Sequence, residues 1–383
     1  MTTKILLVST VRWPSLTRYA GGFVAAGCAV EALAPSGAPA FLSRYVTHVH
    51  GYDALAPSAS IARAIRSSAA DLIVACDDRS VQHLVHLHQS EGRRSPNSPI
   101  AALIAKSLGD VGGYAALLSR LQCLTRLQKA GVRIPETYPV RDEAEVGTTL
   151  RLLGLPAVLK ADGSWGGDGV AIVSTVEEAI SNFRRLSNPP SRLRSVLRAA
   201  RRRDPHFLAM ALAPRGAEVC IQRYIAGSPA ASAFAAWRGE VVGSFHYDVL
   251  VADRVIGPPN VIKRIDCSQM ELACQVAARQ FGLSGLHGID FIRDHDGNVH
   301  VLEVNPRATH GGSLPFGPGR DLPAALVAAL LGRPTTMRPA IANDIVAMFP
   351  REWRRDPSSE YLRIGFHDVP WDDPQVLQAM LKA

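Results

Sequence analysis

The segment "GLHGIDFIRDHDGNVHVLEVNPR" (residues 285–307) constrains the fold more strongly than any other part of this 383-residue chain. Apolar and polar residues alternate on both sides of an Asp-Gly pair, which is the usual signal of a β-hairpin with a two-residue turn. If Asp296 and Gly297 are the two central turn residues, Asp290 lies directly opposite Glu303. The segment therefore predicts two carboxylates side by side on one face of a hairpin.

That pair of carboxylates predicts a site for a divalent cation. Directly opposed Cβ atoms lie about 4.5–5.5 Å apart, and two like charges at that separation are unfavourable without a cation. Asn305 and Arg307 follow Glu303 at steps of two, which keeps them on the same face if the strand continues. Oxygen ligands from Asp, Glu and Asn suit Mg²⁺, or alternatively Mn²⁺, with waters and substrate phosphates as the remaining ligands. The competing interpretation is an ordinary hairpin with solvent-facing acids.

A second hairpin is predicted in "PAVLKADGSWGGDGVAIV" (residues 156–173), where a glycine-rich loop joins two apolar runs. Glycine gives a backbone that can fold tightly and expose its N–H groups to phosphate oxygens. Lys160 precedes the glycines, so this is not a Walker A loop, and the strand after the loop excludes a dinucleotide fingerprint. A lysine beneath a glycine flap remains, and such a loop is either a phosphate cradle or a purely structural turn.

The first hundred residues alternate short apolar runs with helical segments. We expect strands in "KILLV", "AVEALA", "RYVTHVH" and "DLIVACDD", and helices in "SIARAIRSSA" and "RSVQHLVHLHQ". This rhythm predicts an open parallel α/β sheet. Ligands of such sheets gather beyond the carboxyl ends of the strands, so the loops in "STVRWPSLTRY" and "CDDRS" are candidate substrate contacts. A boundary is expected near residue 97, followed by one helix over "YAALLSRLQCLTRLQKAG" that stops at Gly131.

Charge and composition limit the partners that we expect. The net charge is +8, and residues 184–203 contain eight arginines and no acid. Such a stretch attracts polyanions or forms a solvated helical insertion, but it has no interleaved aromatics, so we do not expect a nucleic-acid partner. The six dispersed cysteines indicate neither a zinc knuckle nor a disulfide framework. No apolar run approaches the roughly 20 residues of a membrane-spanning helix, so we expect a cytoplasmic protein, with a homodimer left open.

Taken together, these motifs resemble the ATP-grasp superfamily, which includes biotin carboxylase, carbamoyl phosphate synthetase and D-alanine–D-alanine ligase. The resemblance covers roughly residues 110–335. It implies an α/β fold in which an N-terminal open parallel domain precedes an ATP-grasp fold of two subdomains. The expected parts are an N-terminal domain, an ATP-binding subdomain with an arginine-rich insertion at 184–206, a C-terminal ATP-grasp subdomain and a C-terminal extension, with boundaries at 1–105, 106–225, 226–335 and 336–383.

The resemblance also implies a role for each candidate site residue. Asp290, Glu303 and Asn305 match the metal ligands of the family's "(D/E)…E-x-N-x-R" motif, and Arg307 matches the arginine that contacts the reacting group. Lys160 is expected to act with it. The residues expected to bind ATP are Arg120, Lys160, Gly163, Ser164, Gly166, Gly167 and Gly169 at the phosphates and Gln222, Arg223, Tyr224 and Ile225 at the adenine hinge, which lacks the usual glutamate. Two histidines, His246 and His310, lie where family substrates approach.

The activity that this resemblance implies is ATP-dependent ligation of a small-molecule carboxylate to an amine or similar nucleophile. The carboxylate attacks the γ-phosphate to form an acyl phosphate, and the amine then displaces phosphate. A small-molecule kinase and a nucleotide-binding regulatory subunit without turnover are the alternatives. The intact metal motif favours an enzyme, whereas the missing hinge glutamate favours the regulatory alternative. Carboxylation is less favoured, because residues 336–383 are too few for the extended C-terminal domain of biotin carboxylases.

Overall fold

The N-terminal part of the chain is a parallel α/β domain. The computed structural model describes residues 2–162, 169–188, 192–202, 204, 206–208, 216–253 and 257–382. The first sheet has the order β3-β2-β1-β4 and is parallel throughout, with strands β1 (Lys4–Val8), β2 (Ala29–Ala34), β3 (His48–Gly51) and β4 (Leu72–Ala75). The central strand β1 is almost wholly buried, as expected for a parallel strand covered on both faces. The predicted open parallel sheet is confirmed, although the third strand begins at His48 instead of near residue 44.

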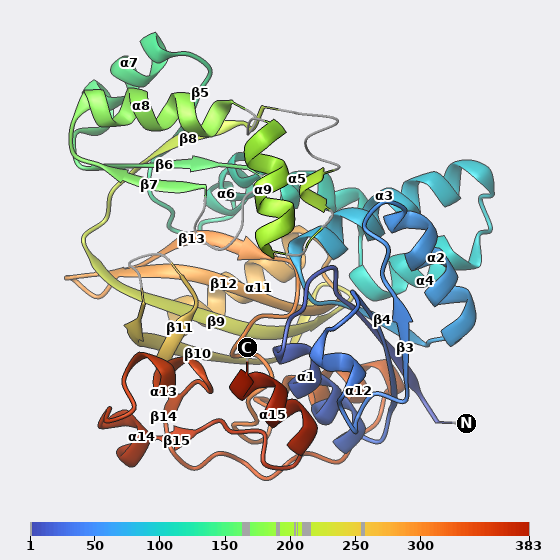
Figure 1. Cartoon of the computed structure of the whole chain (residues 1–383). Coiled ribbons are helices and arrows are strands. Elements are labelled where there is room, and N and C mark those ends of the chain that lie inside the picture. Colours follow the sequence, from blue (N-terminus) through green and yellow to red (C-terminus); the bar gives the residue numbers. More distant parts are fainter. Residues whose placement is uncertain are drawn as a thin grey trace.

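Helices cover both faces of this sheet (Figure 1). They are α1 (Ser15–Ala25), α2 (Pro57–Ser68), α3 (Asp78–Arg94) and α4 (Pro99–Leu108), with short 3₁₀ turns at Pro39–Phe41 and Val111–Gly113. Helix α3 begins directly after β4 because Asp77 forms a capping box with Ser80. Residues at the start of α3 are therefore held at the carboxyl edge of the sheet.

The segment that joins this domain to the next one contains two helices, α5 (Tyr114–Leu118) and α6 (Arg120–Lys129). The expectation of one continuous helix is wrong, because Ser119 adopts an extended conformation (φ −93°, ψ 113°) between them. The break places Arg120 at the first turn of α6, where its backbone N–H donates to Asp162 (3.2 Å). Helix α6 ends as expected near Gly131, whose φ of +86° favours glycine.

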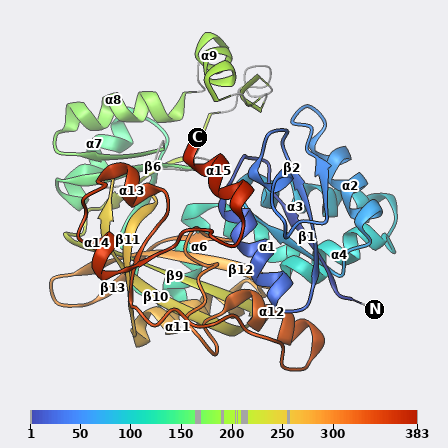
Figure 2. The same cartoon turned by 60° about the horizontal axis from the view of Figure 1, so that its bottom comes forward.

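A small antiparallel sheet follows, with the order β5-β8-β6-β7. Its strands are β5 (Thr137–Val140), β6 (Ala157–Ala161), β7 (Val170–Val173) and β8 (Val219–Arg223). Helices α7 (Glu143–Leu153) and α8 (Val176–Ser187) pack on one face and share an apolar core with it, which includes Leu159, Phe183 and Ile221. The arginine-rich stretch forms the end of α8 and helix α9 (Arg192–Arg202), which projects from the body in Figure 2.

The largest sheet has seven strands in the order β13-β12-β9-β10-β11-β14-β15. They are β9 (Gly227–Trp237), β10 (Glu240–Ala252), β11 (Pro259–Ile265), β12 (Gly285–Asp294), β13 (Val299–Asn305), β14 (Ile345–Ala347) and β15 (Phe366–His367). Helix α11 (Ser268–Gln280) packs on one face of this sheet, and α12 (Leu322–Leu331) packs with α1 against the other (Figure 1). The N-terminal domain and the large sheet share both of these apolar clusters, whereas the small sheet has a core of its own.

The C-terminal residues do not form a separate core. Strands β14 and β15 extend the large sheet, and helices α13 (Arg351–Arg355) and α14 (Tyr361–Ile364) pack beside them. Helix α15 (Pro374–Lys382) ends the described chain. Helix α15 lies beside the N-terminal domain in Figure 2, where Ser43 Oγ donates to Asp373 (2.6 Å). Among the helices in the described part of the chain, none is long and apolar enough to cross a membrane.

Candidate active site

The β12–β13 hairpin carries the predicted acidic pair, but its turn differs from the expectation. Asp294 N donates to Asn298 O (2.9 Å), and the ladder pairs Arg293 with Val299 and Phe291 with Val301. The predicted two-residue turn at Asp296 and Gly297 is therefore wrong, because the loop has three residues. Asp294 stabilises this longer loop, since its carboxylate accepts from the backbone N–H groups of Asp296 and Asn298.

A β-bulge at Leu302 restores the predicted pairing at the site. The register shifts by one residue between Phe291 and Asp290, so that Asp290 pairs with Glu303 as expected. Without the shift, Leu302 would lie opposite Asp290 and Glu303 would face the apolar cluster that contains Val301. The bulge therefore turns Glu303 onto the same face as Asp290.

Glu303 lines a cleft together with Asp78, Arg120 and Asp162. Asp290, paired with Glu303, lies beside it, so the two carboxylates form an acidic wall of this cleft. Asn305 Nδ2 donates to Asp290 Oδ2 (3.0 Å), so the amide holds the carboxylate in place. The Asp290 side chain is open to solvent on this face, but its crowded position between the two sheets, followed by the nearby charge of Glu303, disfavours the ionised form and raises its pKa to about 6. Asn305 turns its Oδ1 toward Arg307 Nη2 (3.1 Å), so in this structure Asn305 contacts both the acid and the arginine of the predicted motif.

Lys160 lies across the cleft, on the small sheet. It pairs with Cys220 of β8 and Val170 of β7, on the face of the sheet opposite the α7–α8 core. Its Nζ donates to the carbonyl oxygen of Leu302 (3.5 Å), the residue that the β13 register skips. Burial, followed by repulsion from Arg120, lowers the pKa of Lys160 to about 8. The predicted lysine is thus a buried cation that faces the acidic hairpin.

Arg120 bridges the two walls. Its Nη2 donates to Glu303 Oε1 (3.0 Å), and its Nη1 donates to Ala161 O (3.0 Å) and lies 3.6 Å from Asp162 Oδ1. Its Nε is buried and has no hydrogen-bond partner among the described residues. A buried donor of this kind fits an anionic ligand in the cleft, because an unmade hydrogen bond costs free energy.

The predicted adenine hinge joins the two sheets, and its side chains point in different directions. Gln222 is buried on the Lys160 side of the small sheet and donates from Nε2 to Thr137 Oγ1 (3.0 Å). The Arg223 side chain faces the other way and forms an ion pair with Glu136, so that only its backbone borders the cleft side. Tyr224 and Ile225 form the connection from β8 to β9.

The glycine loop between β6 and β7 is described only at its end. Ala161 N donates to Gly169 O (2.8 Å), which confirms a strand–loop–strand hairpin with Lys160 on its first strand. The expected phosphate-binding residues Gly163, Ser164, Gly166 and Gly167 lie outside the described residues. Their role stays a prediction.

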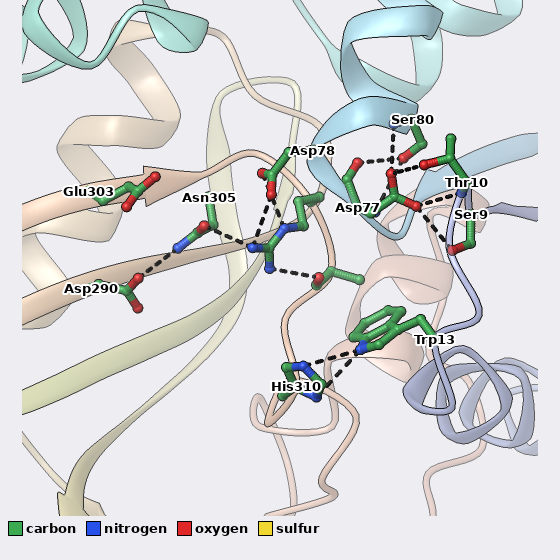
Figure 3. A network of polar contacts seen from close by, with 12 residues as sticks. Ser9, Thr10, Trp13, Asp77, Asp78, Ser80, Asp290, Glu303, Asn305 and His310 are labelled. Atoms are coloured by element: carbon green, nitrogen blue, oxygen red, sulfur yellow. Dashed lines mark hydrogen bonds and ion pairs between the residues drawn. The ribbon is translucent and has the colours of Figure 1, made fainter. Parts of the chain in front are cut away.

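Arg307 connects this cleft to the N-terminal domain. Its Nε and Nη2 donate to the two oxygens of Asp78 (3.2 and 3.3 Å), and Figure 3 shows the resulting chain of contacts from Asp290 through Asn305 to Asp78. Beside it, Ala308 N donates to Ala75 O (2.9 Å) at the end of β4. The predicted catalytic arginine is therefore held by the carboxyl edge of the parallel sheet.

The two candidate histidines have different environments. His310 lies within 3.3 Å of Trp13 Nε1 and 3.1 Å of Ser15 Oγ, and it lines a pocket with Arg351. Burial, with the nearby charges of Arg351 and Arg307, lowers the pKa of His310 to about 3 and favours the neutral ring.

The structure does not bring His246 to the cleft. It is buried on the opposite face of the large sheet, where Nδ1 contacts Ser232 Oγ (2.7 Å) and Nε2 lies 3.2 Å from Glu271 of α11. Tyr247, the next residue along β10, faces the site side instead. The physical reason is the alternation of strand side chains, which places neighbours on opposite faces.

Sequence reasoning named the loop "CDDRS" but missed Asp78 as a partner of Arg307. The signal was available, because an acid directly after a parallel strand lies at the edge where ligands gather. Arg351, which lines the His310 pocket, had no motif to mark it.

Comparison with known proteins gives one family match. The model of the ATP-grasp domain matches residues 210–311, which include the hinge, both acids and Arg307. Over this segment the chain is similar to ATP-grasp domains. No curated protein matches the sequence.

Solved structures extend the match in fold to most of the chain. A biotin carboxylase domain of Hydrogenobacter thermophilus 2-oxoglutarate carboxylase, in complex with MgADP, ADP and bicarbonate, has a TM-score of 0.63 at 17% identity and covers 89% of this chain and 71% of its own. N5-carboxyaminoimidazole synthetase of Staphylococcus aureus, with ADP, has a TM-score of 0.59 at 13% identity, with coverages of 89% and 80%. Biotin carboxylase of Campylobacter jejuni, in a β,γ-ATP complex, has a TM-score of 0.63 at 15% identity, with coverages of 87% and 71%. The predicted ATP-grasp architecture is thereby confirmed.

Proposed function

We propose that this protein is an ATP-dependent ligase that joins a carboxylate to an amine or similar nucleophile through an acyl phosphate. The observation that carries the proposal is the charge of the cleft. The acids Asp290 and Glu303 on one wall face the cation Lys160 on the other, and Arg120 lies between the walls, where it donates to both Glu303 and the Ala161 carbonyl oxygen. A metal-bound polyphosphate complements both walls at once.

The chemistry follows from these charges. A carboxylate oxygen attacks the γ-phosphorus of ATP, the bond to the ADP oxygen breaks, and ADP leaves. The amine nitrogen then attacks the acyl carbon, loses a proton, and phosphate departs. Phosphoryl transfer depends mainly on positioning and charge neutralisation, so Lys160 and Arg120 would bind phosphate oxygens and Arg307 would contact the transferred group.

The residues present also fit a divalent cation. Asp290 and Glu303 are directly paired, and repulsion between them contributes to the raised pKa of Asp290. Among the described residues there is no group of three or more His, Cys, Asp or Glu side chains that could hold a metal alone. This suits Mg²⁺, which is typically bound by one or two carboxylates together with waters and substrate phosphates. Asp290 and Glu303 would hold it, and Mg²⁺ would neutralise charge on the transferred phosphoryl group.

The test is Mg²⁺-dependent ADP release from ATP with pooled small carboxylates, bicarbonate included, and pooled amino acids and amines. Bicarbonate belongs in the pool because one of the similar structures contains it. We expect ADP release that requires one acid together with one acceptor and that disappears in Glu303→Ala. Release that needs only one hydroxylated compound would indicate a kinase instead. Nucleotide binding without release from any pool would contradict the ligase proposal and favour a regulatory role.

A further inference from the structure

The start of helix α3 makes the closest contact between the N-terminal domain and the predicted catalytic arginine. Asp78, in the first turn of α3, forms a side-on pair with Arg307 through Nε (3.2 Å) and Nη2 (3.3 Å). The two residues are 229 positions apart in the sequence, and both side chains are largely covered, at 21% exposure for Arg307 and 28% for Asp78. The contact is therefore a long-range, largely covered ion pair between the N-terminal domain and the cleft.

The backbone around Asp78 is fixed independently of Arg307. Its neighbour Asp77 caps α3 and also accepts from Thr10 N (2.6 Å), Thr10 Oγ1 (2.8 Å) and Ser9 Oγ (3.0 Å). An acidic residue in the first turn is favoured by the helix dipole, so the carboxylate has a stable place at this position. Asp78 can therefore serve as a fixed partner that holds the long Arg307 side chain in one orientation.

The donors of Arg307 show what this attachment does. The two carboxylate oxygens of Asp78 accept from Nε–H and from one N–H of Nη2. Asn305 Oδ1 accepts from the second N–H of Nη2 (3.1 Å), and Ala308 O accepts from one N–H of Nη1 (3.3 Å). A guanidinium has five N–H donors, so among the described residues these contacts leave one donor, on Nη1, for a ligand. The pair with Asp78 thus sets which edge of Arg307 faces the cleft.

We propose that Asp78 is a positioning residue, which orients Arg307 from the N-terminal domain so that its free edge meets the reacting group. Without the carboxylate, the guanidinium keeps only its contacts to Asn305 and Ala308 and can rotate about its side-chain bonds. Small misplacements of a catalytic group cost up to about 100-fold in rate. The kinetic part of this inference rests on the proposed function, whereas the orientation of Arg307 does not.

The chain offers a matched control. Arg293 and Asp248 form a second arginine–aspartate pair across the large sheet (2.7 Å), with side-chain exposures of 34% and 23%. This pair lies on the face of the sheet opposite the acidic site. Asp248→Asn should therefore lose an ion pair of similar exposure without affecting Arg307.

The first measurement is the solvent exchange of the Arg307 Nε–H in ¹⁵N-labelled protein, assigned with Arg307→Lys. We expect exchange at least about tenfold faster in Asp78→Asn than in the unsubstituted protein, because the Nε–H loses its charged acceptor. Asp248→Asn should leave this signal unchanged. An Arg307 signal that is the same in Asp78→Asn would overturn the proposal, whether or not the protein has ligase activity.

The second measurement is ADP release with the acid and acceptor found in the pooled assay. Asp78→Asn should lower kcat about 10- to 100-fold with KM for ATP within about twofold, and Asp78→Glu should recover most of this loss. An equal or higher kcat in Asp78→Asn would overturn the positioning role and would show that the Asp78–Arg307 pair does not assist turnover. If the unsubstituted protein releases no ADP from any pool, the proposed function fails, and the exchange measurement alone decides whether Asp78 orients Arg307.

Discussion

The two walls of the cleft carry opposite charge, and each of them holds an ionisable group close to another group of the same charge. On the large sheet, Asp290 lies beside Glu303, and partial desolvation together with that neighbouring charge raises the pKa of Asp290 to about 6. On the small sheet, Lys160 lies near Arg120, and burial with that cation lowers the pKa of Lys160 to about 8. Each wall thus holds one group that is driven toward its neutral form.

The difference between the walls indicates the ligand. An acidic pair alone calls for a cation, and a basic pair alone calls for an anion. Arg120 partly neutralises the acidic pair by donating to Glu303, and Glu303 in turn partly neutralises Arg120. The Nε of Arg120 nevertheless has no hydrogen-bond partner among the described residues. A ligand with a divalent cation and phosphate oxygens would relieve both walls in the same event. The predictions that follow disable the walls one at a time.

The largest effect is expected from the acidic wall. Glu303→Gln keeps the shape but removes one of two paired charges, so turnover should fall by about 10³-fold, as for loss of one strong electrostatic contact to the transition state. The measurement is kcat for ADP release at saturating Mg²⁺. Glu240→Gln is the control, because Glu240 forms an exposed ion pair with Arg279 away from the cleft. Turnover within tenfold of the unsubstituted protein would exclude Glu303 as a metal ligand.

The basic wall should act on binding more than on turnover. Lys160→Met fills a similar volume without charge, so we expect affinity for ATP to fall about 10- to 100-fold, or about 1.4–2.7 kcal/mol. Calorimetric titration with ATP measures this directly. Lys263→Met, an exposed lysine on β11, is the matched control. An unchanged ATP affinity in Lys160→Met would show that Lys160 serves the Leu302 carbonyl alone.

The sequence predicted the paired acids for a partly wrong reason. Alternation of side chains was enough to place Asp290 against Glu303, but the assumed two-residue turn ignored Asp294, whose carboxylate stabilises a three-residue loop. The pairing survives because the bulge at Leu302 compensates for the longer loop. A turn motif thus gives the existence of a hairpin more securely than its register.

Other parts of the site depend on tertiary structure that no local pattern contains. The parallel sheet and the Lys160 hairpin were predictable, because strand-length apolar runs and glycines mark them locally. The Asp78–Arg307 contact joins segments 229 residues apart. Similarly, no sequence pattern gives a reason to treat His246 and His310 differently. In the fold His246 packs against Glu271 of α11 on one face of the sheet, whereas His310 contacts Ser15 near the other face. Face assignment requires the fold.

The two shifted pKa values predict proton exchange of opposite sign on the two walls. Near pH 6 Asp290 is about half protonated, so MgATP binding should release about half a proton as the carboxylate ionises. Near pH 8 Lys160 is about half protonated, so binding of phosphate should take up about half a proton. Calorimetry in buffers of different ionisation enthalpy measures both. Asp290→Asn should abolish only the proton release, and Lys160→Met should abolish only the proton uptake. Loss of both signals in either variant would show that the two groups do not titrate independently.

The smallest effect tests the face opposite the site. His246→Leu should leave ADP release unchanged but lower the free energy of unfolding by about 1–2 kcal/mol, because a hydrogen bond to a charged group is lost. Glu271 has its pKa lowered to about 2, first by its hydrogen bond from His246. Because the folded-state pKa is depressed, this stabilisation is present above about pH 4.5 and lost as the pH falls toward 2. Urea unfolding across this range should show a shallower pH dependence in the variant. A tenfold fall in kcat with unchanged stability would instead indicate that His246 acts in the active site and would contradict its placement on the opposite face of the sheet.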